Sequence, residues 1–427
     1  IMTITANDPK RKTWLDVPKD SDFPIQNIPF GVFLTRDDII TIGTRIGDYA
    51  IDLGALHQLG YFEGIPLTDD IFLQDTLNDF IADGRKTWRA VRNRIADIFD
   101  EKNSSLKEHE EHRRIVLFTL DEIEMQLPVQ VGDYTDFYSS KEHATNVGEL
   151  FRGKEDALLP NWLHVPVAYH GRSSSIIPSG IPVHRPKGQK KPKGSEDPIF
   201  GPSRLVDFEL EMAFITTAAN PLGEPIAVED AEEYIFGMVL FNDWSARDIQ
   251  KWEYIPLGPF LAKNFASSVS PWIVTLDAIE PFRTEGPKPV KKQLPYLQSK
   301  GKKTFDIALE VAIQPEGKAE TVVSRSNFKY LYWNMSQQLA HHTINGCPIN
   351  SGDMMGSGTI SGPKESSFGS MLELSWNGDK PIKLKEGGDR KFINDNDTVI
   401  IRGHCENKNV RIGFGEVRTK LLPTYKG

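Results

Sequence analysis

Short apolar runs separated by turn residues make up the first part of the chain. Residues 31–34 (GVFL), 39–42 (IITI) and 49–53 (YAIDL) are apolar and rich in β-branched residues, and Gly and Asp stand between them. Such runs bounded by turn residues are typical of strands. We therefore predict a small β-rich unit at the start of the chain.

A helical pattern follows these strands. Apolar residues recur at helical spacing up to Phe99, so we predict a helix over 69–99 with Thr68 as its N-cap. The polar run 100–114 reads as a linker or helix end. We place a domain boundary near residue 120, which gives an N-terminal domain over 1–120, a small barrel with helical additions, and a second domain over 121–427.

The second domain alternates predicted strands with loops rich in Gly and Pro, and its clearest predicted helix covers 326–342. The Lys- and Pro-rich segments 186–198 and 287–303 lack interleaved aromatic residues, so we expect solvated loops there and no nucleic-acid surface. We expect a mostly β architecture.

One predicted strand, 205–214, carries three acidic residues. Side chains alternate between the two faces of a strand, so Asp207, Glu209 and Glu211 are expected to share one face. If this face is exposed to solvent, the repulsion between the three carboxylates is tolerable. If it is not, a hard cation such as Mg²⁺ or Ca²⁺ would remove the repulsion. Both interpretations stay open from this strand alone.

Other acids occupy positions that favour a role in a site. Asp243 follows the buried run 236–241, where a strand opens into a loop, and Asp136 precedes His143. Glu373 is the only charge in the run 370–376, which also alternates like a strand, and it either faces solvent or holds a water or a histidine. Near His143, Tyr138 and Arg152 are polar anchors suited to a carboxylate ligand.

Composition limits the classes of partner and site. The 427 residues carry 50 Lys plus Arg and 59 Asp plus Glu, a formal charge of -9, which argues against a dedicated binder of nucleic acid or anionic membrane. Cys347 and Cys405 are the only cysteines, so a disulfide framework is excluded and a reducing compartment is favoured. No stretch of about 18 apolar residues occurs, so we expect a cytosolic protein. The glycine-rich run 356–362 fits neither a phosphate-binding loop nor a serine nucleophile motif.

Several longer segments resemble the fumarylacetoacetase family, in its eukaryotic two-domain form. They are DYTDFYSSKEHATNVG, LFRGKEDALLPNWLHVPVAYHGRSSS, DFELEMAF, FGMVLFNDWSARDIQKWEYIPLGPFLAKNF and GSGTISGPKESSFGSMLELSW. FPIQNIPFGVF near the start and VIIRGHCENKNVRIGFGEV near the end match as well, so the resemblance covers nearly the whole chain.

The resemblance implies an N-terminal SH3-like β-barrel domain and a C-terminal domain of mixed β-sandwich and β-roll character, paired as a homodimer. It also implies metal-dependent hydrolysis of 4-fumarylacetoacetate to fumarate and acetoacetate, the last step of tyrosine and phenylalanine catabolism, with Mg²⁺ or Ca²⁺ as the cofactor.

Matching the family's motifs residue by residue assigns roles. The resemblance makes His143 the general base, oriented by Glu373, with Arg247, Gln250 and Lys263 facing the oxyanion. It implies metal ligands at Asp136, Glu209, Glu211, Asp243, Lys263 and Ser267, the lysine through its backbone carbonyl. Ser267 stands where the family carries threonine, and keeps the hydroxyl. The implied substrate contacts are Tyr138, Arg152, Tyr169, Gln250, Tyr254 and Thr359.

Two other functions remain possible on sequence alone. One is a related hydrolase or decarboxylase of another 3-oxo acid, although such relatives are usually shorter and lack the N-terminal barrel. The other is a non-catalytic binding protein of the same fold, which the presence of His143, Glu373 and four metal carboxylates argues against.

Overall fold

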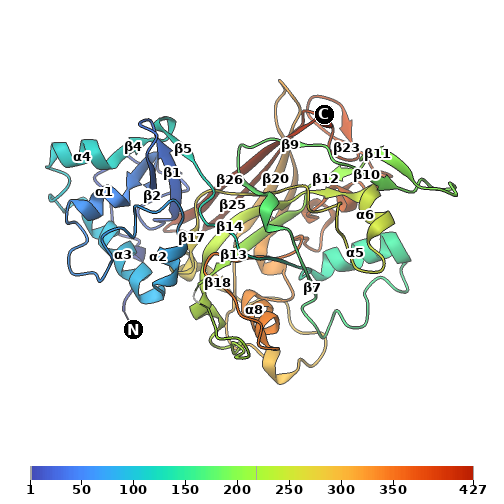
Figure 1. The fold of residues 1–427 in the computed structure, drawn as a ribbon, viewed down its shortest axis with the longest axis horizontal. Helices are drawn as coiled ribbons and strands as arrows, with labels where there is room; N and C mark the ends of the chain where they lie inside the picture. The colour runs from blue at the N-terminus through green and yellow to red at the C-terminus, as the bar shows by residue number, and fades with distance from the viewer. Residues whose placement is uncertain (1, 218, 427) are drawn as a thin grey trace.

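A computed structural model describes residues 2–217 and 219–426, and it has a smaller and a larger lobe lying side by side (Figure 1). The smaller lobe is built on a five-stranded antiparallel sheet in the order β4-β3-β2-β1-β5. The strands are β1 (Phe30–Thr35), β2 (Ile40–Ile46), β3 (Tyr49–Asp52), β4 (Leu117–Thr119) and β5 (Ile123–Met125). The three predicted strands are confirmed, and the sheet continues to Met125.

Four helices accompany this sheet: α1 (Leu53–Gln58), α2 (Asn78–Ala82), α3 (Arg85–Ile98) and α4 (Glu110–Val116). The prediction of one helix over 69–99 is wrong. Turns occupy residues 69–77, and Gly84 separates α2 from α3 with a φ of +85°, a conformation that only glycine adopts freely. Thr68 therefore caps no helix. Part of the run predicted as a linker or helix end forms the separate helix α4.

The described part of the larger lobe is built on two large sheets. The first has eight strands, ordered β7-β6-β22-β13-β14-β16-β8 with β17 paired to β14. Its strands are β6 (Tyr134–Phe137), β7 (Ala168–His170), β8 (Ile176–Pro178), β13 (Leu210–Thr216), β14 (Ile235–Asp243), β16 (Ser267–Val269), β17 (Val274–Thr275) and β22 (Met354–Gly356). The second, ordered β21-β20-β25-β26-β9, comprises β9 (Val183–His184), β20 (Ala308–Gln314), β21 (Thr321–Asn327), β25 (Thr398–Glu406) and β26 (Arg411–Leu422).

One core lies between the two sheets and another between the first sheet and the smaller lobe. Leu210, Met212 and Phe214 of β13 pack with residues of the second sheet such as Val417. Residues on the opposite face, such as Ala213, pack with side chains of the smaller lobe. The mostly β, two-domain architecture is confirmed.

The remaining elements are short, and they connect or flank the two sheets. The helices are α5 (Lys141–Arg152), α6 (Arg247–Glu253), α7 (Leu276–Ile279), α8 (Met335–Thr343) and α9 (Met371–Leu374). The strand pairs are β10 (Lys187–Lys190) with β11 (Ile199–Pro202), β12 (Val206–Asp207) with β15 (Ser245–Ala246), β18 (Arg283–Thr284) with β19 (Thr304–Phe305), and β23 (Ile382–Lys383) with β24 (Asp389–Arg390).

Three predictions in this lobe need correction. The helix predicted over 326–342 starts only at Met335, because β21 continues to Asn327 and Asn334 caps α8 with its side chain. Residues 370–376 form a helical turn and not a strand. The segment 186–198, predicted as a loop, contains β10.

Both cysteines are free thiols, Cys405 in the core and Cys347 partly buried. Over the described part of the chain, every helix is too short or too polar to cross a membrane.

Candidate active site

Four carboxylates on or directly before strands β6, β13 and β14 of the eight-stranded sheet meet at one place. Asp136, Glu209, Glu211 and Asp243 each offer an oxygen, and these oxygens lie within 4.8 Å of one another. All four side chains are buried. Strand register explains the meeting, because β22 pairs with both β6 and β13, and β13 pairs with β14.

The face on which these acids lie is the one that the smaller lobe covers further along the strands. Glu211 shares its face of β13 with Ala213 and Ile215, and Asp243 shares its face of β14 with Phe241. Where that cover ends, the apolar residues of this face give way to the carboxylates. The same strand face therefore contributes apolar side chains to the core and, further along, carboxylates to the site.

The chemistry of this cluster suits a hard divalent cation. Oδ1 of Asp136 and Oε1 of Glu211 are buried, and neither accepts a hydrogen bond from a residue that the structure describes. Gly356 leaves space between them, since a Cβ there would lie 3.0 Å from Oδ1 of Asp136 and 3.1 Å from Oε2 of Glu211. Clustered carboxylate oxygens with free lone pairs are the ligands that Mg²⁺ and Ca²⁺ take. The four residues fit such an ion.

Lys263 compensates part of this negative charge. Its Nζ donates to Asp243 Oδ2 at 3.0 Å and to Oε2 of Glu209. Burial would raise the pKa of Glu209, but the charges of Lys263 and Arg247 outweigh it and hold that pKa well below its usual range. Burial and the neighbouring carboxylates raise the pKa of Asp136 and of Glu211.

Asp243 has further contacts. Ser267 Oγ donates to its Oδ1 at 3.0 Å, and the hydroxyl of Tyr169 donates to its Oδ2 at 3.2 Å. Ser267 thus lies beside the acid cluster, as the resemblance requires of a residue at this position.

His143 and Glu373 form a buried pair next to the cluster. Nδ1 of His143 lies 2.7 Å from Oε2 of Glu373. Ser140 caps α5 and its Oγ accepts from the backbone N–H of His143, which places the histidine in the first helical turn. Burial opposes ionisation of Glu373, but the pKa of this carboxyl is lowered by His143 and by hydrogen bonds from Asn146 and Ser370. An ionised Glu373 holds the ring proton on Nδ1 and leaves Nε2 for other chemistry.

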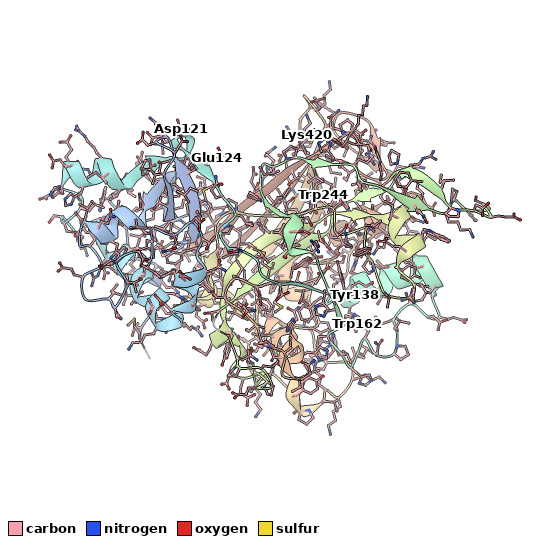
Figure 2. All side chains as sticks on the ribbon, in the orientation of Figure 1. Asp121, Glu124, Tyr138, Trp162, Trp244 and Lys420 are labelled. Atoms are coloured by element: carbon pink, nitrogen blue, oxygen red, sulfur yellow. The ribbon has the colours of Figure 1, made fainter. Side chains whose placement is uncertain are left out.

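These groups surround a cavity of about 320 Å³. Twelve of the predicted site residues line it: Asp136, Tyr138, His143, Arg152, Tyr169, Glu209, Glu211, Arg247, Gln250, Tyr254, Lys263 and Thr359. The other three lie behind the wall: Glu373 behind His143, Asp243 behind Lys263 and Tyr169, and Ser267 behind Asp243. In Figure 2, Tyr138 is seen near Trp162, whose indole N–H donates to the Tyr138 carbonyl at 2.8 Å.

Two unpaired donors belong to cavity-lining residues. Nη2 of Arg247 and Oγ1 of Thr359 are buried and have no hydrogen-bond partner among the described residues. Nη1 of the same arginine donates to Gln250 Oε1 at 3.0 Å, which leaves the amide nitrogen of Gln250 as a donor. Arg152 is exposed, so it stands at the rim of the cavity.

Asp207 is not a member of the acid cluster, which corrects the prediction that it shares a face with Glu209 and Glu211. The strand is interrupted between β12 and β13, and Asp207 binds Arg247. The sequence pattern did not predict a role for Asn146, whose side-chain amide donates to Glu373 Oε1 at 2.9 Å. Its position three residues after His143, on the same helix face, is the signal that could have found it.

The same two-domain organisation appears in models of known families. Residues 26–128 match the model described as Fumarylacetoacetase N-terminal, and residues 133–422 match Fumarylacetoacetate (FAA) hydrolase C-terminal. This defines a two-domain hydrolase class. The chain belongs to the fumarylacetoacetase family.

Individual relatives agree over nearly the full length. The human fumarylacetoacetase is 51% identical over 415 residues, which is 96% of this chain and 99% of that protein. The Arabidopsis thaliana fumarylacetoacetase is 48% identical over 416 residues, 97% of this chain and 99% of the relative. A solved fumarylacetoacetate hydrolase from psychrophilic Exiguobacterium antarcticum superposes with a TM-score of 0.52 at 15% identity, covering 93% of this chain and 99% of that chain, which shows a shared fold.

Proposed function

We propose that this protein hydrolyses the carbon–carbon bond of fumarylacetoacetate, yielding fumarate and acetoacetate, and that it needs a divalent cation for this. The observation that carries the proposal is the His143–Glu373 pair, because it lies beside four buried carboxylates at one cavity in a chain that is about half identical to curated fumarylacetoacetases. A non-catalytic binding protein would have no need of a buried histidine held by a buried ionised glutamate.

Hydrolysis of such a bond starts with a water that must lose a proton. Nε2 of His143 accepts this proton as the water oxygen adds to a ketone carbonyl of the substrate, and Glu373 stabilises the resulting imidazolium through Nδ1–H. A general base of this kind contributes a factor of about 10²–10⁴ in rate.

The carbonyl oxygen becomes an oxyanion in this step. Nη2 of Arg247, the amide of Gln250 and the third N–H of Lys263 are the donors placed to stabilise it, each worth ~3 kcal/mol in comparable sites. The carbon–carbon bond then breaks, the carbonyl becomes the new carboxyl group of fumarate, and His143 returns its proton to the carbanion carbon of acetoacetate.

Asp136, Glu209, Glu211 and Asp243 would hold the cation. A second ion, Mg²⁺ in the family that the chain resembles, would take Asp243, Ser267 and the backbone carbonyl of Lys263. A bound Mg²⁺ or Ca²⁺ supplies Lewis-acid stabilisation of negative charge on the β-diketone oxygens. Tyr138, Arg152, Tyr169, Tyr254 and Thr359 are the proposed substrate contacts, and Arg152 is suited to bind a substrate carboxylate.

The test is a direct assay of the purified protein. Fumarylacetoacetate is supplied with Mg²⁺ or with Ca²⁺, loss of the diketone absorbance is followed, and the two acids are quantified. We expect equal amounts of fumarate and acetoacetate and loss of turnover in excess chelator. Absence of turnover with either ion contradicts the proposal, and turnover of only another 3-oxo acid supports the related hydrolase instead.

We also propose a homodimer in the cytosol. Support comes from the family resemblance and, for the compartment, from the two free thiols. Light scattering and cell fractionation test the two statements separately.

A further inference from the structure

Asp207 is a buried carboxylate that the proposed mechanism does not use. Its side chain is 0% exposed, and β12, on which it lies, is a two-residue strand paired with β15 directly before Arg247. Oδ2 of Asp207 accepts from Nε of Arg247 at 2.9 Å. The same carboxylate therefore fixes the guanidinium whose Nη2 is left free at the cavity.

The carboxylate also binds a second element of the site. Oδ1 accepts from the backbone N–H of Met371 at 2.7 Å, and Oδ2 from that of Leu372 at 2.9 Å. These two residues begin α9, and the next residue of α9 is Glu373, which binds His143. Asp207 thus contacts both the arginine proposed for the oxyanion and the helical turn that presents the glutamate.

This helical turn depends on outside partners. A four-residue helix makes too few internal N–H···O bonds to be stable alone. Its first N–H groups also have no partners inside the helix. Asp207 binds the first two of them, and Ser370 Oγ accepts from the third, the N–H of Glu373, at 3.3 Å. Asp207 therefore fixes the start of the turn that carries Glu373, while Ser361, Ser370 and Asn146 bind the carboxylate itself.

We propose that Asp207 is a positioning residue of the active site, which holds Arg247 and the Glu373–His143 pair in a fixed relation to each other. The inference rests on the proposed function, in which the two groups act on the same carbonyl. The Glu373–His143 pair takes the proton of the attacking water, and Arg247 binds the developing oxyanion. Displacement of either group by about 1 Å lowers the reaction rate more than it lowers the affinity for the substrate.

The first test is Asp207→Asn, which keeps the shape but replaces one acceptor oxygen by an NH₂ group facing N–H donors. We expect kcat to fall about 10- to 100-fold, with KM changed by less than about threefold and with the metal still bound, because the four carboxylates are retained. If Asp207→Asn does not fold, Asp207→Ser takes its place in the same assays. A kcat equal to that of the wild type overturns the proposal.

Asp397→Asn is the matched control. Asp397 is also buried, and it accepts from Nε and Nη2 of Arg390 at 2.7 and 2.8 Å and from the backbone N–H of Asn394 at 2.9 Å, but it does not line the cavity. It should lower the melting temperature and leave kcat unchanged. An equal loss of kcat in both variants would mean that any buried Asp–Arg pair has this effect, which also overturns the proposal.

A double-mutant cycle separates positioning from general destabilisation. Because part of the effect of Asp207 passes through Glu373 and is absent in a Glu373→Gln background, the variant Asp207→Asn/Glu373→Gln should lose less kcat than the product of the two single losses. Losses that multiply would show independent effects and contradict the role.

A crystal structure of Asp207→Asn makes the outcome independent of the substrate. We expect Arg247 and α9 to shift and the 2.7 Å contact between His143 and Glu373 to be lost. If the wild type does not turn over fumarylacetoacetate, the proposed function fails while this structure still decides on Asp207. Unmoved Arg247 and Glu373 side chains would overturn the positioning role.

Discussion

Burial strengthens the repulsion between the four carboxylates, because water cannot screen their charges. Lys263 is the cation that reaches two of them, and its own pKa is raised by Asp243 and Glu209 even though burial opposes this. Removing one partner of a buried ion pair leaves an uncompensated charge, at a cost of about 3–5 kcal/mol. Lys263 and a divalent ion therefore each neutralise part of the negative charge of the four carboxylates.

Lys263→Met tests this at the residue scale. We expect the metal-free variant to melt well below the metal-free wild type, and saturating Mg²⁺ or Ca²⁺ to raise its melting temperature by more than it raises that of the wild type. Lys190→Met, at a buried lysine beside Asp248 and outside the cluster, is the control and should leave the metal-induced rise unchanged. Equal metal-induced rises in wild type and Lys263→Met would contradict the account.

Metal affinity should also depend on pH. Burial and neighbouring carboxylates raise the pKa of Asp136 and Glu211, so these groups keep protons at a higher pH than free carboxylic acids. An incoming cation must displace those protons, so affinity is expected to weaken as pH falls and binding to release protons. Calorimetric titration in two buffers of different ionisation enthalpy measures the release, and identical enthalpies in both buffers would refute it.

Single elements contribute by bringing residues of distant sequence to one place. Gly356 on β22 lies opposite Asp136 of β6 and Ala213 of β13, so this strand separates the two strands that carry acids. The missing side chain at Gly356 makes the approach of Asp136 and Glu211 possible.

Gly356→Ala is expected to weaken metal binding about 10-fold, within the range seen when groups around metal ligands are disturbed, while the metal-free protein stays folded. The reason is the added Cβ, 3.0 Å from Oδ1 of Asp136. Gly201→Ala is the control on β11, because its Cβ meets nothing within 4 Å. Titration with Mg²⁺ and Ca²⁺ gives the affinities, and unchanged values in Gly356→Ala would show that the carboxylates do not depend on this space.

The elements also show how far the sequence pattern reaches. The continuous apolar run 236–241 correctly predicted the buried strand that ends at Asp243, since β14 is long and buried on both faces. Alternation between the two faces of a strand was less reliable. It failed for Glu373, because seven residues are too few to distinguish a buried helical turn from a buried strand. It also failed for Asp207, because the interruption between β12 and β13 arises from pairing with β15 and from Arg247, both distant in sequence. The residue roles came from the family resemblance and remain proposals.

The two lobes share one core and an ion-pair network. Phe30, Phe80 and Trp88 of the smaller lobe pack against Phe236 of the larger one. Beside them, Asp277 on α7 accepts two hydrogen bonds from Arg89 on α3, at 2.6 and 2.8 Å. The smaller lobe therefore supports the sheet that carries the acid cluster without entering the cavity.

Asp277→Asn should destabilise the whole molecule in a pH-dependent way. Burial opposes ionisation of Asp277, but hydrogen bonds and charge from Arg89 lower its pKa. A lowered pKa gives stability that is complete above the unfolded value of about 3.9 and is lost as pH falls through the folded value. We expect a lower melting temperature than wild type at pH 7 and a smaller difference below about pH 4.

Thermal unfolding from pH 7 to pH 3.5 measures this difference. Lys420→Met, which breaks an exposed pair with Glu316, is the control and should have little effect. A melting temperature of Asp277→Asn equal to wild type at pH 7 would rule out a stabilising contact between the lobes.

At the scale of the molecule, the formal charge of -9 says little about the cavity. Arg152, Arg247 and Lys263 line it together with Asp136, Glu209 and Glu211, and Asp243 lies directly behind. Three cations therefore face four carboxylates, and one bound divalent ion changes the local balance from negative to positive. An anionic substrate is then attracted to the cavity, although the protein as a whole is acidic.

The central claim is tested most directly by comparing wild type and His143→Ala with fumarylacetoacetate under identical metal saturation. We predict that the wild type forms fumarate and acetoacetate in equal amounts, and that His143→Ala loses at least about 100-fold in kcat while keeping its fold and its metal affinity. A wild type without turnover, or a His143→Ala variant as fast as wild type, would contradict the account.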